Sequence, residues 1–273
     1  MKLLALVALA LGLAAGDAGP TAEISMPGRF YAPNRLDALV GTTVTWRNTD
    51  AVSHTVTADN GSFDSGFLLP GATFSREFSQ PGVYKLHCTI HRFMRGAVRV
   101  YALVLTGPDR PLTAGARVLF AGLAPAEATD VVLERATGTG WQTVDRRPPA
   151  ADGRYAFTAI ASQPALYRAR AGNRTSPRVR VHVAPVVRAR VVGQTMRVAT
   201  SPARPSARAV LQTYDRERFG FVSGPRTRLG ANGAGRLRLP PAPRAHVRVL
   251  VRGNGGWSDG TSQVFAVGSP PHR

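Results

Sequence analysis

The stretch "YKLHCTIHRFMRGAVRV", residues 84–100, contains the only cysteine of the chain, Cys88, close to His91 and Met94. Apolar and polar residues alternate before the cysteine, in "GVYKLHC", and after the methionine, in "GAVRV", so both segments are predicted to be β-strands. Cys88 shares the parity of Leu86, and its side chain is therefore expected to point inward. The short loop between the strands can bring Cys88, His91 and Met94 to a single point.

A fourth candidate ligand, His54, follows the alternating segment "TTVTWRNTDAVS" and opens the predicted strand "HTVT". Two imidazoles, one thiolate and a weak axial thioether are the ligand set of a mononuclear blue-copper site, because sulfur suits the cuprous ion and nitrogen the cupric ion. We therefore predict that one type 1 copper ion is bound by His54, Cys88, His91 and Met94. Zinc is the main alternative, but methionine is a poor zinc ligand and structural zinc sites normally use more cysteines.

Longer segments around these residues carry a family resemblance. The order "VTWRNTDAVSHTV", "GSFDSGFLLPGATFSREF", "PGVYKLHC" and "CTIHRFMRG" resembles the plastocyanin-like cupredoxins over residues 23–101, and the ligand loop is most similar to that of amicyanins. The resemblance implies a Greek-key β-sandwich and places the four candidate ligands at the copper positions. It also implies transfer of single electrons between larger redox proteins.

The ligand region departs from the family pattern at three places. Ile90 and Arg92 replace the prolines of typical family loops, so this loop is expected to be less stiff. Thr55 stands where an asparagine often braces the ligand loop. Arg92 also places a positive charge beside His91, which is expected to raise the reduction potential and to favour a redox partner with an acidic surface.

His87, next to the cysteine, raises the alternative of a second, catalytic copper, as in nitrite reductases and multicopper oxidases. The parity of His87 directs it away from Cys88, and the remaining histidines, His182, His246 and His272, are isolated in the sequence. The chain also lacks a nucleophile-elbow motif and a glycine-rich phosphate loop. We therefore expect that the protein is not an enzyme.

The first residues, "MKLLALVALALGLAAG", have a lysine, a short apolar run and small residues where a signal peptidase could cut, so residues 1–16 are predicted to be a signal peptide. No transmembrane segment is expected, because no later stretch approaches the length that a membrane helix needs. The expected location is periplasmic, extracellular or at the cell surface.

One cysteine cannot form an internal disulfide, and bound copper would protect it from oxidation.

The remainder of the chain repeats itself. The segments "ARVLFAGLAPAEATDVVLERATGTGWQTV" and "MRVATSPARPSARAVLQTYDRERFGFV" share a pattern with a period of about 80 residues, the size of one small immunoglobulin-like sandwich. The chain is thus predicted to be all-β. A cupredoxin domain is expected at residues 17–101, followed by immunoglobulin-like β-sandwich domains at 102–184 and 185–273.

Arginine dominates the charge of these two repeats. Residues 102–273 contain 26 arginines and nine acidic residues, and in segments such as "RVRVHV" and "HVRVLVR" the arginines take alternate positions. We interpret these arginines as the solvent-exposed face of the strands. The chain uses arginine almost exclusively as its basic residue, since Lys2 and Lys85 are the only lysines. The alternative is an electropositive surface that binds an anionic cell-surface polymer, lipid head groups or nucleic acid. The lack of a nucleic-acid motif or stacking platform argues against nucleic acid.

Three functions remain open from the sequence. The first is a single-electron carrier that cycles between cuprous and cupric states. The second is copper storage, delivery or sensing outside the cytoplasm, with the C-terminal domains holding the copper module near a surface. The third is an adhesive protein with a structural copper. Reversible one-electron cycling would distinguish the first of these from ready transfer of copper to an acceptor.

Overall fold

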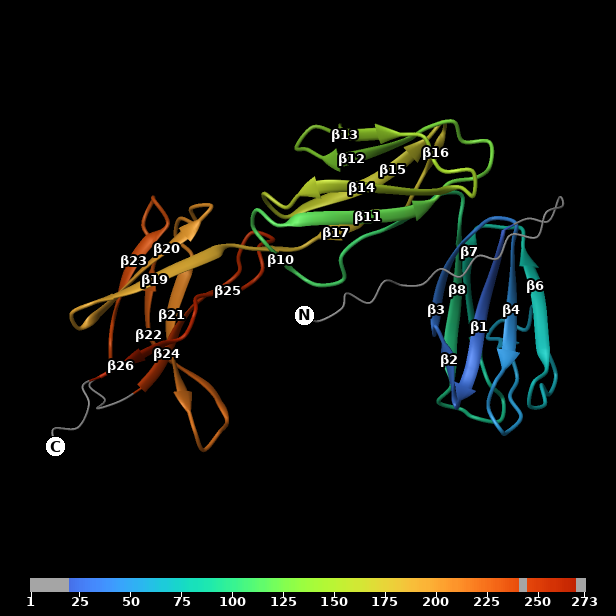
Figure 1. Ribbon diagram of the computed structural model, residues 1–273, viewed down its shortest axis with the longest axis horizontal. Coiled ribbons are helices and arrows are strands. Elements are labelled where there is room, and N and C mark those ends of the chain that lie inside the picture. The colour runs from blue at the N-terminus through green and yellow to red at the C-terminus, as the bar shows by residue number, and fades with distance from the viewer. Residues whose placement is uncertain (1–19, 241–244, 269–273) are drawn as a thin grey trace.

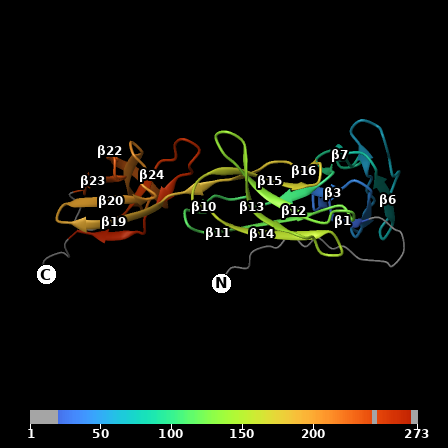
Figure 2. The ribbon, with the colours of Figure 1, turned by 90° about the horizontal axis from the view of Figure 1, so that it is seen from above.

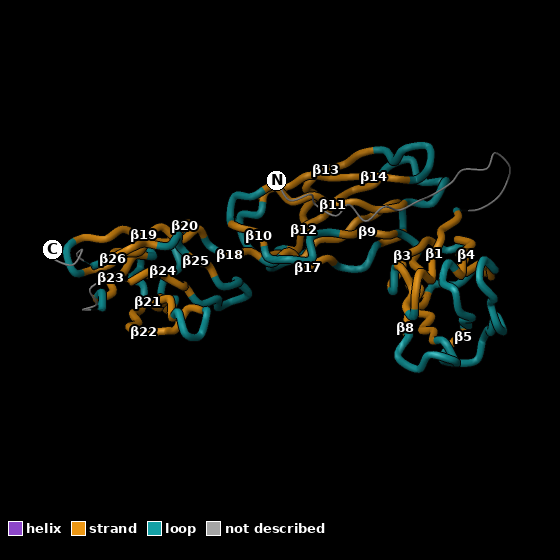
Figure 3. Tube along the Cα trace, turned by 60° about the horizontal axis from the view of Figure 1, so that its bottom comes forward, coloured by secondary structure: helices purple, strands orange, loops and turns teal. Residues whose placement is uncertain are grey.

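The computed structural model describes residues 20–240 and 245–268, and within these ranges the chain consists of strands and loops only (Figure 3). The predicted all-β class is thereby confirmed. The described residues include no helix that is long and apolar enough to cross a membrane. The predicted signal peptide at 1–16 lies outside the described residues.

The first β-sandwich packs the sheet β2-β1-β4-β6 against the sheet β3-β8-β7-β5. The pairs β1–β4 and β3–β8 are parallel, so the chain crosses between the sheets instead of following hairpins alone. The strands are β1 (Thr21–Gly28), β2 (Phe30–Ala32), β3 (Arg35–Leu39), β4 (Thr42–Asn48), β5 (Thr57–Ala58), β6 (Thr73–Phe78), β7 (Gly82–His87) and β8 (Arg95–Tyr101).

The core of this sandwich follows from the alternation that the sequence shows. In β4 every second side chain is buried, and Trp46 at its centre packs against Phe63, Phe74 and Phe78 with ring centroids 5.9–6.3 Å apart. Full burial of one such side chain stabilises the fold by about 1.5–3 kcal/mol. Cys88 belongs to the same apolar core, so the candidate metal centre rests directly on it.

The strand expected to open at His54 is shorter than the sequence indicates. Strand β5 covers only Thr57–Ala58, and His54 pairs with Leu68 through an isolated bridge, with N···O distances of 3.1 and 2.8 Å. The segment before β5 pairs with the long loop that precedes β6. His54 and Val56 are both buried, and so is Thr55 between them, so burial does not alternate in this segment.

Two further sandwiches follow along the chain, and their sheets have the same strand order (Figures 1 and 2). The second joins β14-β11-β9 to β13-β12-β15-β16, with β17 on β15, and the third joins β23-β20-β19 to β22-β21-β24-β25, with β26 on β24. The second contains β9 (Val104–Thr106), β10 (Leu112–Thr113), β11 (Arg117–Leu123), β12 (Val131–Ala136), β13 (Trp141–Arg147), β14 (Arg154–Ile160), β15 (Ala165–Ala171), β16 (Arg174–Thr175), β17 (Val179–Val181) and β18 (Val183–Ala184). The third contains β19 (Val186–Val192), β20 (Thr195–Ser201), β21 (Arg208–Asp215), β22 (Gly220–Arg228), β23 (Ala234–Arg238), β24 (Ala245–Val251), β25 (Gly260–Thr261) and β26 (Phe265–Val267).

Equivalent hydrogen bonds show that these two sandwiches are one unit used twice. The N–H of Ala169 in β15 donates to the hydroxyl of Ser176 at 2.9 Å, and the N–H of Val249 in β24 donates to the hydroxyl of Ser262 at 2.9 Å. Each serine also donates its own N–H back to the carbonyl of the same strand residue, at 3.0 Å in the second sandwich and 2.9 Å in the third. The immunoglobulin-like character of this unit stays a prediction.

Small contacts join the three sandwiches. Leu39 and Tyr101 of the first pack with Val104 and Leu123 of the second in a separate apolar cluster. Between the second and third, Trp257 packs against the core of the second. Each sandwich otherwise has an apolar core of its own.

Gly122 in β11 has no room for a side chain, so Gly122→Ala is expected to destabilise the second sandwich by about 1–3 kcal/mol or more through overpacking. An added Cβ would lie 2.0 Å from the Val104 carbonyl oxygen and 2.4 Å from the Tyr155 ring. Denaturant unfolding followed by circular dichroism measures the loss. Gly138→Ala is the control, because no atom lies within 4 Å of its added Cβ. Equal stability of the two variants would contradict the packing described.

Candidate metal centre

Three metal-ligating side chains converge at one end of the first sandwich. The Sγ atom of Cys88 lies 4.0 Å from Nδ1 of His54 and 3.6 Å from Nδ1 of His91, and all three atoms lie within 4.8 Å of one another. Cys88 and His54 are fully buried, whereas His91 is partly exposed. It is the one cluster of this kind among residues 20–240 and 245–268.

The ligand loop is closed by its own backbone. Strand β7 ends at His87, and the N–H of Cys88 donates to the carbonyl of Met94 at 3.1 Å, while the N–H of Met94 donates to the carbonyl of His91 at 2.8 Å. These bonds fold the segment between β7 and β8 into a tight turn without the family prolines. Met94 is 1% exposed and lies in the core beneath the loop. The sequence-predicted ligands Cys88, His91 and Met94 therefore share one compact turn.

Thr55 joins the His54 segment to the ligand loop. Its hydroxyl accepts the N–H of Thr89 at 2.9 Å, and its own N–H donates to Sγ of Cys88 at 3.3 Å. Its carbonyl accepts the hydroxyl of the buried Tyr31 at 2.7 Å, and burial raises the pKa of that phenol. The shorter threonine side chain therefore makes a brace to the ligand loop at the position that an asparagine often takes in the family.

Asp50 orients the buried imidazole of His54. Nε2 of His54 lies 3.0 Å from Oδ2 of Asp50, and this hydrogen bond holds the pKa of the Asp50 carboxyl below its usual range. An imidazole that donates from Nε2 presents an unprotonated Nδ1, the atom that faces Cys88. The turn is held by Asn48, whose amide donates to the carbonyls of Val52 and Leu68 at 2.8 Å. Sequence reasoning did not identify Asp50 or Asn48; the "NTD" turn four residues before His54 was the available signal.

His91 forms the solvent edge of the cluster. Its ring centroid lies 4.9 Å from that of His54 and 6.3 Å from that of Phe93. Loss of solvent around the ring, followed by the nearby His54 and the Arg29 guanidinium, lowers the pKa of His91. A lowered pKa keeps the imidazole neutral near pH 7, which is the form that binds a metal.

The donor separations fit a bound metal ion. Metal–nitrogen and metal–sulfur bonds of about 2.0–2.3 Å place neighbouring donors about 3.5–3.8 Å apart in a trigonal plane, close to the 3.6 and 4.0 Å observed between sulfur and the two nitrogens. One thiolate and two imidazoles with a thioether in the adjoining core are the donors of a single type 1 copper site.

His87 is engaged elsewhere. Its Nδ1 lies 2.7 Å from Oδ1 of Asp59 on the outer side of β7, and the Arg95 guanidinium reaches the same carboxylate at 3.4 Å. Its predicted orientation away from Cys88 is confirmed. His182 and His246 are exposed and join no cluster of metal ligands within the described residues, and His272 lies outside them.

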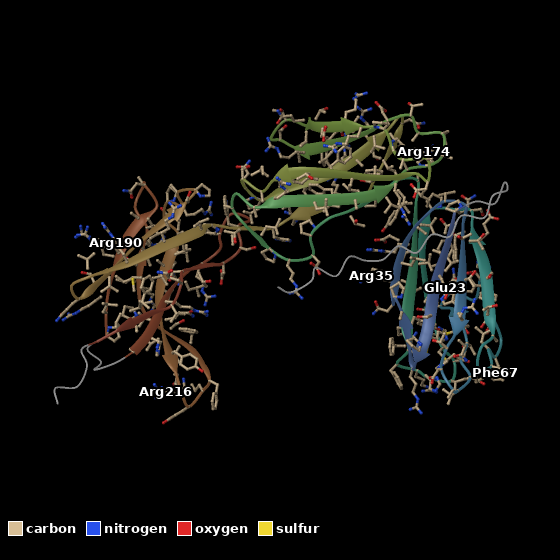
Figure 4. All side chains as sticks on the ribbon, viewed as in Figure 1. Glu23, Arg35, Phe67, Arg174, Arg190 and Arg216 are labelled. Atoms are coloured by element: carbon tan, nitrogen blue, oxygen red, sulfur yellow. The ribbon has the colours of Figure 1, made fainter. Side chains whose placement is uncertain are left out.

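Exposed apolar side chains gather in the loops that carry the ligands. Phe67 and Leu69 flank Leu68, the bridge partner of His54, and Phe93 packs beside the His91 ring. We call Phe67, Leu69, Ile90 and Phe93, which are 72, 63, 44 and 70% exposed, the ligand-end patch. Phe67 lies at the end of the first sandwich far from the second (Figure 4).

Comparisons with known proteins match this part of the chain. Residues 26–101 match the family model of copper-binding proteins of the plastocyanin/azurin family. Amicyanin-alpha from Methylorubrum extorquens is 37% identical over 78 residues, which are 26% of this chain and 64% of that protein. Amicyanin from Paracoccus denitrificans is 35% identical over 75 residues, 26% of this chain and 57% of that protein. The chain thus spans less than two thirds of these relatives.

A solved structure also matches. A purple cupredoxin from Nitrosopumilus maritimus is 39% identical, and the match covers 29% of this chain and 98% of that one with a TM-score of 0.28.

Removal of the Asp50 carboxylate tests its effect on His54. Asp50→Ala is expected to lower copper affinity about 10- to 100-fold, because groups that orient a metal-ligating histidine typically contribute this much. Competition with a chelator of known affinity measures the change. Glu77→Gln is the control, since Glu77 is an exposed acidic residue on β6 of the same sandwich. If both variants bind copper as the parent does, Asp50 has no such role.

Proposed function

We propose, on the premise that the N-terminal sandwich is a cupredoxin with an amicyanin-like ligand region, that this protein carries single electrons. His54, Cys88, His91 and Met94 would hold one copper ion, which supplies a one-electron couple between cuprous and cupric states. The observation that carries the proposal is the contrast in exposure: two donors are fully buried, while His91 reaches the surface. We also propose that the protein is a carrier and not an enzyme.

The protein's own groups support rapid electron exchange by staying fixed. The Thr55 N–H bond to Cys88 and the Asp50 bond to His54 hold the donors in place before any metal arrives. Such preorganisation means that the donors need little rearrangement when the charge at the site changes. The Thr55 N–H also stabilises electron density on the sulfur, which favours the reduced state.

The surface around His91 supports docking of a redox partner. The ligand-end patch offers an apolar contact area, and Arg92 is exposed beside it. Arg29 lies close enough to affect the titration of His91. An apolar centre with positive charge at its edge suits a partner with an acidic rim, because the charges steer encounter and the apolar contact holds the complex.

Burial of the donors distinguishes electron transfer from copper storage or delivery. Cys88 and Met94 are 0 and 1% exposed, so an acceptor protein could approach only His91 without opening the loop. The proposal therefore favours retention of the ion.

The remaining parts of the chain complete the proposal. We propose a division into a signal peptide at 1–16, a cupredoxin domain at 17–101 and two β-sandwich domains at 102–184 and 185–273. The signal peptide would direct the protein to the periplasm or the cell exterior. There the arginine-rich C-terminal part would contact an anionic cell-surface polymer.

Spectroscopy of the mature chain with added cupric ion tests the copper proposal. An intense blue thiolate band and a small copper hyperfine splitting in electron paramagnetic resonance are expected, and Cys88→Ser is expected to abolish both. His87→Gln is the matched control, since His87 pairs with Asp59 and should leave the spectrum unchanged. A colourless or weakly bound ion in the parent chain would refute the proposal, and electrochemical cycling would then separate transfer from storage.

Arg92→Ala tests the charge beside His91. Loss of one positive charge near the centre is expected to lower the reduction potential by about 10–40 mV and to weaken the salt dependence of electron exchange with an acidic redox protein. Voltammetry and stopped-flow kinetics measure the two effects. Arg117→Ala, in the second sandwich, is the control for net charge. An unchanged potential and salt dependence in Arg92→Ala would contradict this role.

A further inference from the structure

The third sandwich carries a row of arginines across the sheet β23-β20-β19. Arg190 in β19 lies directly opposite Arg197 in β20, and Arg197 lies directly opposite Arg236 in β23. Residues paired in this way point to the same face of the sheet, and all three are exposed. No carboxylate among the described residues forms an ion pair with any of them. Like charges placed directly opposite destabilise a sheet, so this row carries a cost to folding.

The second sandwich provides an internal comparison. The N–H of Ala124 donates to Gly153 at 2.8 Å and the N–H of Thr200 donates to Gly233 at 3.1 Å, so these pairs mark equivalent positions in the two sandwiches. Counting residues along the strands from these equivalent pairs shows that the arginine row of the third sandwich corresponds to a row of small neutral residues in the second. That row consists of Thr106, Ala121 and Ala156, which are paired in the same order.

Charge pairing differs between the two sandwiches as well. In the second, Glu134 accepts hydrogen bonds from Arg168 and Arg170 at 2.7 and 3.2 Å. At the equivalent place in the third, the neutral Gln212 accepts from Arg248 at 2.9 Å. Residues 102–184 hold 11 arginines and six acidic residues, whereas residues 185–273 hold 15 and three. General arginine usage does not by itself account for the row, because both repeats are rich in arginine but the second has neutral residues at the three equivalent opposed positions.

The row borders an open recess of about 540 Å³ on this face. Arg188 and Asn232 also line it, together with small residues that include Ala199 and Gly235. No aromatic side chain lines the recess. Arg190 projects from this part of the third sandwich, well apart from Arg216 (Figure 4).

We propose that this recess binds a linear polyanion that carries repeated phosphate or sulfate groups. Guanidinium groups recognise such tetrahedral oxyanions through paired hydrogen bonds. The arginines of the row stand on neighbouring strands about 4.8 Å apart, so successive anionic groups can each contact one guanidinium. Single-stranded nucleic acid is a poorer match, because its bases need aromatic stacking partners. The inference rests on the proposed anionic partner of the C-terminal part and is independent of the copper centre.

Titration of the full chain with inorganic polyphosphate and with heparin, a sulfated polysaccharide, tests the site. The triple variant Arg190→Ala, Arg197→Ala, Arg236→Ala is expected to lose at least about tenfold in affinity for the tighter-binding probe. The matched control removes three exposed arginines that do not line this recess, Arg110, Arg117 and Arg216, and is expected to lose less than about threefold. Equal losses in both variants, or no loss in the first, would overturn the site.

Further probes separate the sources of the anionic groups. Tighter binding of polyphosphate assigns a phosphate polymer, and tighter binding of heparin assigns a sulfated glycan. The chain could instead bind oligothymidylate or phosphatidylglycerol vesicles more tightly than both polymers, with affinity lost in the same triple variant. That result would overturn the proposal in favour of nucleic acid or membrane. Both triple variants are expected to retain the parent copper spectrum, so failure of this proposal is distinct from failure of the electron-transfer proposal.

Thermal unfolding supplies a second readout. Without ligand, the Arg190, Arg197, Arg236 triple variant is expected to melt about 1–5 °C higher than the parent, because the like-charge contacts are gone. Polyphosphate is expected to raise the melting temperature of the parent but not of this variant. The proposal would be contradicted if the variant folds normally, has a melting temperature no higher than that of the parent, and is stabilised by polyphosphate to the same extent.

Discussion

The hydrogen bonds of Thr55 are the constraint on which the metal centre depends. They connect two segments that are far apart in the sequence, since the hydroxyl accepts from Thr89 and the backbone N–H donates to Cys88. The bridge to Leu68 and the Tyr31 hydroxyl also hold the His54 segment, but neither of them contacts the ligand loop. A buried thiolate also requires a donor, because an uncompensated charge in an apolar core is costly. One residue thus positions the sulfur and reduces the cost of its burial.

The core of the first sandwich and its metal centre are consequently one structure. Cys88 and Met94 pack in the same apolar cluster as Leu86 and Trp46. Burial of the sulfur donors therefore contributes to folding before copper binds, and it also sets which donor meets the solvent. His91, on the same loop, remains partly exposed. The exposure pattern that supports electron transfer thus follows from which donors pack in the core.

The sequence predicted the local features of the site well and the non-local ones less well. Cys88, His91 and Met94 lie on one short loop, so their spacing alone brings them together. The contact of Asp50 with His54 depends on a turn that Asn48 holds, and the bridge of His54 to Leu68 replaces the longer strand that alternation predicted. Strand parity predicted exposed arginines, but it carries no information about which exposed residues face each other. That requires the register between strands.

Register changes the interpretation of the arginine-rich repeats. In the second sandwich the buried Glu134 carboxylate balances two arginine neighbours. In the row through Arg197, exposed arginines lie directly opposite one another, an arrangement that costs stability. The two copies of one fold thus differ at a row where an uncompensated charge costs stability. A partner that supplies the missing negative charge would offset that cost when it binds.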